Sequence, residues 1–349
     1  MVTIARKEFE RFSDRALHDM SSAVLVLDRK ENIIYVNDAA SEILEVESGK
    51  RREETHFDLY SDDAYNDAFH DAILNALFHK KSTLQDRVPY KSPSGRTYML
   101  EISSSYLPGA TEDDAELVIT FVDDTEVEVT RQRLVDSSRT FSTFLFGFCI
   151  WILFYAFWEF MKRPWPSDYM THGVELLGLV MLYFIFRYTS LTWHDLGIMT
   201  DKPRETVRTA LFVAAGAVVL LFVIKLIARA VDPASFRPDA PFFDLSRFGA
   251  RQVIYIFTAG IQEFLARSVI QGNIRRITVV KNPGLLAICL SSLIFAALHI
   301  HLGFLFMCGA AILAGLEGIL YEKQGNIFGV WIVHWVFGVC GTLLSLIDH

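Results

Sequence analysis

The feature that most limits how this chain can fold is a series of long apolar segments, all of which lie after residue 140. Most of them approach the roughly 20 residues that a helix needs to cross a lipid bilayer. Charged residues make up 21% of the chain and are concentrated before residue 140. We therefore predict a soluble domain followed by an all-α, polytopic transmembrane helical bundle.

Seven segments are candidate transmembrane helices: residues 141–160, 174–188, 210–231, 251–270, 285–301, 304–321 and 327–347. Basic residues favour the cytoplasmic ends of such helices, and Lys202, Arg204 and Arg208 form one basic group. We expect a multi-pass bacterial protein of the cytoplasmic (inner) membrane with its N-terminal domain in the cytoplasm. The net charge of −8 argues against a nucleic-acid-binding surface.

The N-terminal part has the pattern of an α+β domain. Strands are predicted at residues 23–27, 33–36, 84–90, 97–106 and 116–122, and helices at 38–44 and 62–79. The stretch AVLVLDRKENIIYVNDAASEIL resembles the opening hairpin and first helix of a PAS domain. The stretch ELVITFVDDTE resembles its last strand, with the closing Asp-x-Thr signature at Asp123 and Thr125.

The PAS resemblance implies a sensor that dimerises the protein and could respond to an unidentified small molecule. We expect no cofactor, because the domain contains no cysteine for flavin chemistry. His56, His70 and His79 are expected to be surface residues, with haem ligation as the alternative. The predicted organisation is a PAS domain at 1–125, a connector at 126–140 and a membrane domain at 141–349. The connector is either a signalling helix or a passive linker.

Ionisable side chains inside apolar segments are costly in a bilayer, so they indicate function by default. Glu263 and Arg267 are four residues apart and can pair on one face of a helix. His299 ends one apolar segment and His334 lies within another. Glu317 lies in a third, with a glycine close by on either side. A carboxylate there must be paired, protonated or hydrated.

These residues resemble, in order, the motifs of the CAAX-protease and bacteriocin-processing (CPBP) family. Gln262-Glu263-x-x-x-Arg267 corresponds to Glu-Glu-x-x-x-Arg, Phe295-x-x-x-His299 to Phe-x-x-x-His, and His334-x-x-x-Gly338 to His-x-x-x-Asn/Asp. The resemblance covers about residues 145–345. It implies an intramembrane endopeptidase in which His299 and a carboxylate activate water while His334 stabilises the oxyanion.

Two positions depart from the family pattern. Gln262 replaces the first Glu of the motif, and loss of a general base costs about 10²–10⁴ in rate. Gly338 replaces the Asn or Asp, and loss of one oxyanion donor costs about 10²–10³. Glu317 could lie near the histidines and supply the missing carboxylate, or it could face a polar cavity near the cytoplasmic end.

The sequence thus predicts a PAS-regulated intramembrane endopeptidase that acts on a peptide or protein in the membrane. The candidate catalytic residues are Gln262, Glu263, Arg267, His299, His334 and Glu317. A catalytically inactive pseudoprotease that binds a membrane partner is the main alternative, and a transporter that uses the buried charges is a third. We expect no metal ion, because the histidines have no obvious third ligand except Glu263.

Overall fold

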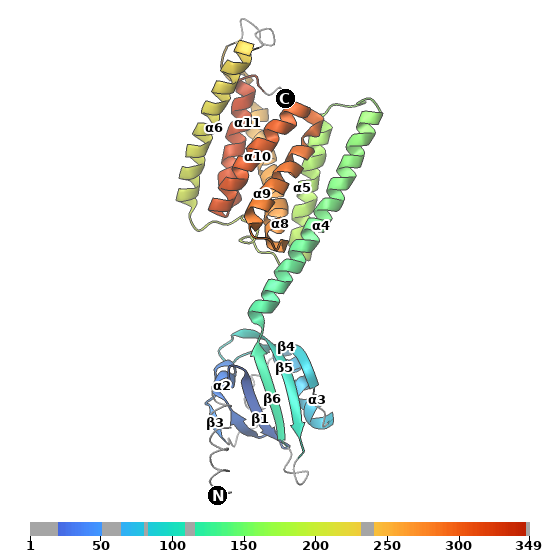
Figure 1. Cartoon of the computed structure of the whole chain (residues 1–349), viewed down its shortest axis with the longest axis vertical. Coiled ribbons are helices and arrows are strands. Elements are labelled where there is room, and N and C mark those ends of the chain that lie inside the picture. Colours follow the sequence, from blue (N-terminus) through green and yellow to red (C-terminus); the bar gives the residue numbers. More distant parts are fainter. Residues whose placement is uncertain (1–19, 51–63, 80–82, 109–115, 232–240, 347–349) are drawn as a thin grey trace. The chain divides into compact units, whose positions relative to one another are not determined.

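The computed structural model describes residues 20–50, 64–79, 83–108, 116–231 and 241–346. The chain divides into two compact units, Met1–Arg131 and Gln132–His349, which we call the N-terminal unit and the helical unit (Figure 1). His56 lies outside the described residues. Of the other two PAS-region histidines, His79 is exposed as expected, whereas His70 is partly buried.

The N-terminal unit is built on one antiparallel sheet of six strands in the order β3-β2-β1-β6-β5-β4. The strands are β1 (Ala23–Asp28), β2 (Ile33–Val36), β3 (Gly49–Lys50), β4 (Thr83–Lys91), β5 (Thr97–Leu107) and β6 (Glu116–Asp123). The short helix α2 (Asp38–Leu44) begins where the side chain of Asn37 accepts a hydrogen bond from the backbone N–H of Ala40. This oxygen also accepts from Val24 N, which fixes α2 against β1.

One hydrophobic core joins this sheet to its helices. Phe69 of α3 (Asp67–His79) is fully buried, and its ring lies 4.9 Å from that of Tyr90 on β4 and 6.0 Å from that of Phe121 on β6. The short 3₁₀ helix η2 (Ala64–Asn66) precedes α3. The predicted strands and helices are therefore present, while the two-residue β3 was not predicted because so short a strand has no sequence pattern.

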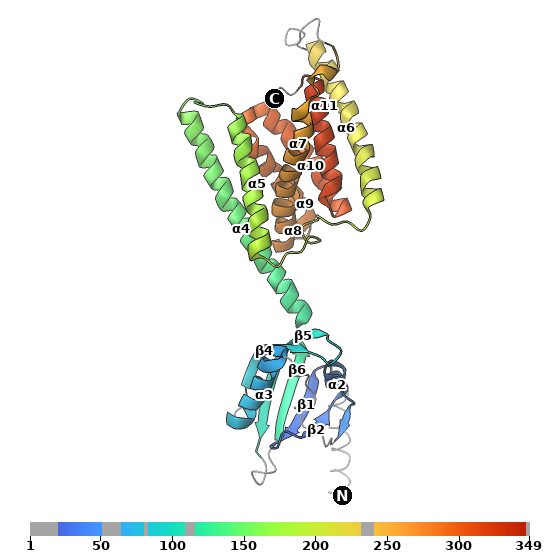
Figure 2. The same cartoon turned by 180° about the vertical axis from the view of Figure 1, so that it is seen from behind.

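The helical unit consists of long helices that lie roughly side by side (Figures 1 and 2). They are α4 (Thr125–Phe160), α5 (Asp168–Tyr188), α6 (Pro203–Val231), α7 (Ala250–Glu263), the π-helix η6 (Phe264–Gln271), α8 (Gly272–Ile277), α9 (Pro283–Leu298), α10 (Phe304–Gln324) and α11 (Ile327–Leu343). Short 3₁₀ turns lie at Leu245–Arg247 and Ile300–Leu302. The helix α4 includes the predicted connector, so residues 126–139 are helical.

In the described part of the chain, five helices are long and apolar enough to cross a membrane: α4, α5, α6, α10 and the continuous run Ala250–Ile277. The apolar helices α9 and α11, with 16 and 17 residues, are shorter than this criterion requires. Part of the difference from the seven predicted spans lies at the helix ends. The predicted span 285–301 ends as a helix at Leu298, and the predicted span 327–347 ends as a helix at Leu343. The predicted span 174–188 differs in the other direction, because its helix begins earlier, at Asp168.

Two tryptophans of α11 hold this helix against α7. The indole N–H of Trp331 donates to the carbonyl of Ile256 at 2.6 Å, and that of Trp335 donates to the carbonyl of Gln252 at 3.0 Å. Gly260 allows this approach, because a Cβ there would lie 2.7 Å from the Trp331 ring. The tryptophans thus join two helices inside the bundle, as small residues and buried polar contacts commonly do in membranes.

Candidate active site

The central helix of the bundle changes its winding at the predicted motif. The α-helix α7 ends at Glu263, the π-helix η6 comes next, and α8 completes the run. Such π segments occur often at functional sites. Neighbouring residues on a helix point about 100° apart, so Gln262 and Glu263 face different surroundings. The sequence predicted a helix here but not this change of winding.

Glu263 and Arg267 form a buried ion pair, as their spacing predicted. The Nε of Arg267 donates to Glu263 Oε2 at 2.9 Å, and both side chains are completely buried. The same guanidinium donates to Gln271 Oε1 at 3.0 Å and to Glu317 Oε2 at 3.4 Å. Gly318 leaves room for this guanidinium, because a Cβ there would lie 3.1 Å from Arg267 Nη1.

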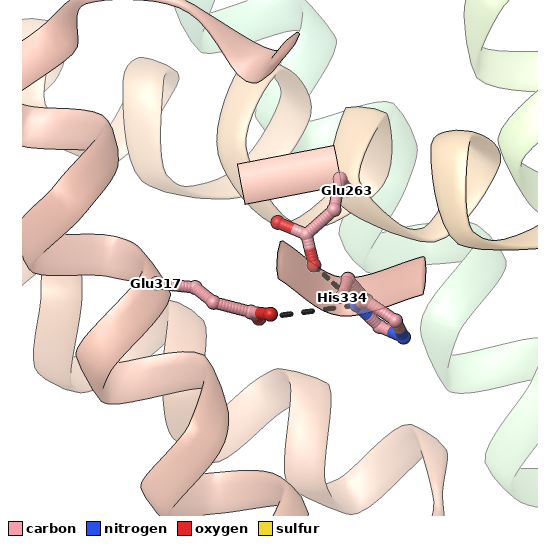
Figure 3. A group of neighbouring side chains, drawn as sticks. All are labelled: Glu263, Glu317 and His334. Carbon is pink, nitrogen blue, oxygen red and sulfur yellow. Dashed lines mark hydrogen bonds and ion pairs between the residues drawn. The ribbon is translucent and has the colours of Figure 1, made fainter. Parts of the chain in front are cut away.

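His334 joins this network from α11 (Figure 3). Its Nδ1 donates to Glu263 Oε1 at 2.7 Å and lies 3.8 Å from Glu317 Oε2. The expectation that Glu317 lies close to the histidines is therefore confirmed for His334. Glu263, Glu317, Arg267 and His334 form one buried cluster of two carboxyl groups, one guanidinium and one imidazole.

His299 lies just beyond the last residue of α9. Its Nδ1 donates to the carbonyl oxygen of Phe295 at 2.8 Å. A carbonyl can only accept, so Nδ1 carries a proton and the neutral ring has its lone pair on Nε2. The centroid of the Phe295 ring lies 4.5 Å from that of His299 and 5.9 Å from that of His334. One aromatic ring thus contacts both histidines.

A cavity of ≈ 760 Å³ brings these groups together. Gln262, His299 and His334 all line it, together with Tyr255 and Gly338. Gln262 is only 4% exposed, and among the described residues its Oε1 has no hydrogen-bond partner. Gln262 thus belongs to the cavity wall, and its amide oxygen is buried.

Three of the predicted catalytic residues lie behind this cavity rather than in its wall. Glu263, Arg267 and Glu317 are at most 1% exposed and are not among its described lining residues. They contact one another and His334, and Arg267 also donates to Gln271. The structure thus separates the predicted set into a group that faces the cavity and a group that supports His334.

Tyr255 is a cavity residue that the sequence reasoning missed. Its ring centroid lies 6.1 Å from that of His334, and its hydroxyl oxygen lies 2.7 Å from the place that a Cβ at Gly338 would take. Tyr255 precedes Gln262 by seven residues, which is about two helical turns. That spacing, which puts the two residues on one helix face, is the signal that could have identified it.

Glu263, Glu317 and His334 also meet the distance requirement for a metal site, because one ligand atom from each lies within 4.8 Å of the others. The sequence reasoning counted only Glu263 as a third ligand and missed Glu317. However, Arg267 pairs with both carboxylates. The positive charge that a metal ion would bring is thus already present in this cluster.

Comparisons with known proteins find two families in the chain. Residues 248–340 match the model of the Rce1-like type II CAAX prenyl endopeptidases, and residues 11–113 match that of the PAS fold. No curated protein matches the chain.

Solved structures similar to the N-terminal part include three PAS domains. One comes from a two-component sensor histidine kinase (20% identity, 34% of this chain, 98% of that chain, TM-score 0.26). Another belongs to a protein of Colwellia psychrerythraea (11% identity, 34% of this chain, 98% of that chain, TM-score 0.29). The third belongs to nitrogen regulation protein NR(II) of Vibrio parahaemolyticus (22% identity, 31% of this chain, 93% of that chain, TM-score 0.24). The PAS assignment rests on the family model.

Proposed function

Since the chain joins a PAS domain to an Rce1-like CAAX protease domain, we propose that it hydrolyses a peptide bond of a membrane-associated substrate under PAS control. The observation that carries this proposal is the cavity that Gln262, His299 and His334 line together. Apolar helices surround it, and a polar cluster supports one of its histidines. This combination suits water-dependent chemistry on a peptide that is shielded from bulk solvent.

His299 is the group best suited to activate water. Its Nδ1–H bond to Phe295 directs the lone pair of the neutral ring to Nε2. A water held by the Gln262 amide would lose a proton to Nε2 as its oxygen attacks the peptide carbonyl carbon. The same proton would then pass to the leaving amine nitrogen as the carbon–nitrogen bond breaks, so that His299 returns to its starting state.

His334 is suited to stabilise the oxyanion. Its Nδ1–H is bonded to Glu263, so Nε2 must carry a second proton if the ring is to donate to a substrate. A His334 ring that carries a proton on both nitrogens would present its Nε2–H to the developing oxyanion.

Gln262 is the observation that favours the alternative, a pseudoprotease. A glutamine keeps the shape of glutamate but cannot accept a proton at ordinary pH. The same cavity would then bind a membrane peptide without cleaving it, and PAS control would act on binding. The two functions differ in a measurable way, because only the protease responds to restoration of a carboxylate at this position.

The test compares cleavage of candidate membrane peptides by four purified proteins in lipid: the parent, Gln262→Glu, Gln262→Glu with His299→Ala, and Gln262→Glu with His194→Ala. We expect Gln262→Glu to cleave at least about 10²-fold faster than the parent. His299→Ala should abolish this activity. His194 is an exposed loop histidine, so its replacement is the matched control and should have no effect.

Each outcome assigns one function. Cleavage that rises with Gln262→Glu and disappears with His299→Ala supports the protease. A protein that stays inactive after the substitution but binds peptide is a pseudoprotease. Equal cleavage in all four proteins would place the activity elsewhere and exclude this cavity as the catalytic site.

The remaining parts of the proposal concern the setting of this activity. The protein would lie in the bacterial inner membrane with the PAS domain in the cytoplasm, where the domain would form a homodimer and could bind a small-molecule signal. The five membrane-length helices support the membrane location. The basic residues near the end of α5 and the start of α6 support the orientation.

A further inference from the structure

Tyr255 occupies a distinctive place in the cavity wall. It lies on α7 on the same face as Gln262, and it approaches the face of α11 that carries His334 and Gly338. Residues 334 and 338 are four apart and therefore lie one above the other on α11. The phenol of Tyr255 thus lies beside His334, at the level of Gly338, which is one helical turn from His334 along α11.

The contact with Gly338 is close enough to exclude any larger residue there. A Cβ at position 338 would lie 2.7 Å from the Tyr255 hydroxyl oxygen and 2.8 Å from its ring carbon Cζ. Neither atom can move without displacing the ring. Tyr255 therefore fills the space that a side chain at position 338 would otherwise take, and it brings a hydroxyl group to that space.

We infer that Tyr255 donates the second hydrogen bond to the oxyanion, in place of a side chain at position 338. The inference rests on the proposed function, because an oxyanion forms only if the cavity hydrolyses a peptide. Two donors, His334 Nε2–H and the Tyr255 hydroxyl, would then meet on one side of the cavity. His299 and Gln262 would hold the attacking water.

The chemistry of a phenol suits this position. A phenolic O–H donates strongly yet remains neutral at physiological pH, so it adds no charge beside the buried cluster of His334. The aromatic ring packs against apolar neighbours while its hydroxyl reaches the polar region. A donor fixed by ring packing is preorganised, and such donors are effective because little reorganisation is needed during the reaction.

The first test is Tyr255→Phe, which removes the hydroxyl and keeps the ring. It is made in whichever of the parent and Gln262→Glu proteins cleaves. We expect kcat to fall about 10²–10³-fold with KM nearly unchanged, because the lost contact exists only in the transition state. Tyr183→Phe, at an exposed position on α5, is the matched control and should cleave at the rate of its parent.

The second test moves the donor to the neighbouring helix. Gly338→Asn alone should lower the melting temperature, because the new side chain collides with Tyr255. Adding Tyr255→Ala should restore the melting temperature and make room for the Asn amide beside His334. We expect this double variant to cleave at least about 10-fold faster than Tyr255→Ala alone, since it recovers a donor.

The outcomes separate this inference from the proposed function. Cleavage by Tyr255→Phe at the rate of its parent overturns the role of Tyr255 and leaves the protease standing. Absence of cleavage in the parent and in Gln262→Glu overturns the proposed function and the oxyanion role with it. The melting temperatures test the packing of Tyr255 against Gly338 independently of activity. If Tyr255→Ala fails to restore the melting temperature of Gly338→Asn, that packing is overturned.

Discussion

Arg267 is the residue on which the buried cluster depends most. It is completely buried, and it donates to both Glu263 and Glu317. An ion pair in such a place adds little net stability, because removing two charges from water costs about what their attraction returns. Removing only one partner is different, since it leaves the other charges buried without compensation.

We therefore expect Arg267→Leu to lower the free energy of unfolding by about 3–5 kcal/mol. Thermal unfolding in detergent would measure this loss. Glu317→Gln should recover part of it, because the substitution removes a buried carboxyl group that has lost its contact with Arg267. Arg275→Leu is the control, because Arg275 is exposed and pairs with Glu322 at the surface. Such exposed pairs contribute about 1 kcal/mol or less. Equal destabilisation by the two arginine variants would contradict the role given to Arg267.

Residue types and spacing predicted much of this site. The i, i+4 spacing of Glu263 and Arg267 was enough to predict their pairing, because helix geometry is regular. The position of Glu317 was predicted only as one of two alternatives, since nothing local indicates where a side chain fifty residues away on another helix will point. Tyr255 was missed because a tyrosine in an apolar helix is usually a packing residue.

At the scale of elements, apolar length predicted where helices occur but not where each one ends. Gly325, with φ +67°, ends α10 in the left-handed conformation, and Asn326 then caps α11 through a hydrogen bond from Phe328 N. The π winding of η6 had no sequence signal, because the segment contains neither glycine nor proline. All eight residues of η6 are buried, and no local pattern encodes how they pack against other helices.

The connection between α5 and α6 links α4 to the site. Asp136 of α4 is fully buried and accepts from the backbone N–H and the hydroxyl of Ser190, at 2.8 and 2.6 Å. A few residues on, the carbonyl of Leu196 accepts from Ser268 of the π-helix at 2.5 Å. The carbonyl of Gly197 accepts from the backbone N–H of residue 327, the first residue of α11, at 2.9 Å. A rotation of α4 therefore acts on the connection between α5 and α6, which is bonded to both η6 and α11.

This linkage predicts that activity depends on the helical phase of α4. Inserting one to four alanines between Val129 and Thr130, an exposed part of α4, rotates the rest of the helix by about 100° per residue. We expect cleavage to vary with insert length and to recover near three or four residues. In Asp136→Ala proteins, where the bonds to Ser190 are lost, the dependence should flatten. Parent-like cleavage at every length would show that the connector is a passive tether.

At the scale of the whole chain, the two matched families lie in different units, the PAS model in the N-terminal unit and the protease model in the helical unit. Within the helical unit the cavity is associated with one end of the bundle. Its polar lining includes Asp168, His172 and Glu175 near the start of α5, and Arg251 near the start of α7. A hydrophilic peptide segment would enter from this end.

The last prediction concerns the side of the membrane on which that end lies. The 21 residues of α5 extend about 31 Å at ~1.5 Å per residue, close to the ~30 Å hydrocarbon core. His172 near its start and Asp201 beyond its end should therefore lie on opposite sides. Lys202, Arg204 and Arg208 come soon after Asp201, so we expect that end to lie in the cytoplasm.

The measurement is labelling of single cysteines by a membrane-impermeant maleimide, after replacement of the native cysteines by alanine. In intact cells, His172→Cys should be labelled, and Asp201→Cys should be labelled only after permeabilisation. The cavity would then receive peptides from the extracytoplasmic side, which argues against a cytoplasmic CAAX substrate despite the family name. The reverse pattern would place the cavity entrance in the cytoplasm, and labelling of both positions in intact cells would mean that α5 does not cross the membrane.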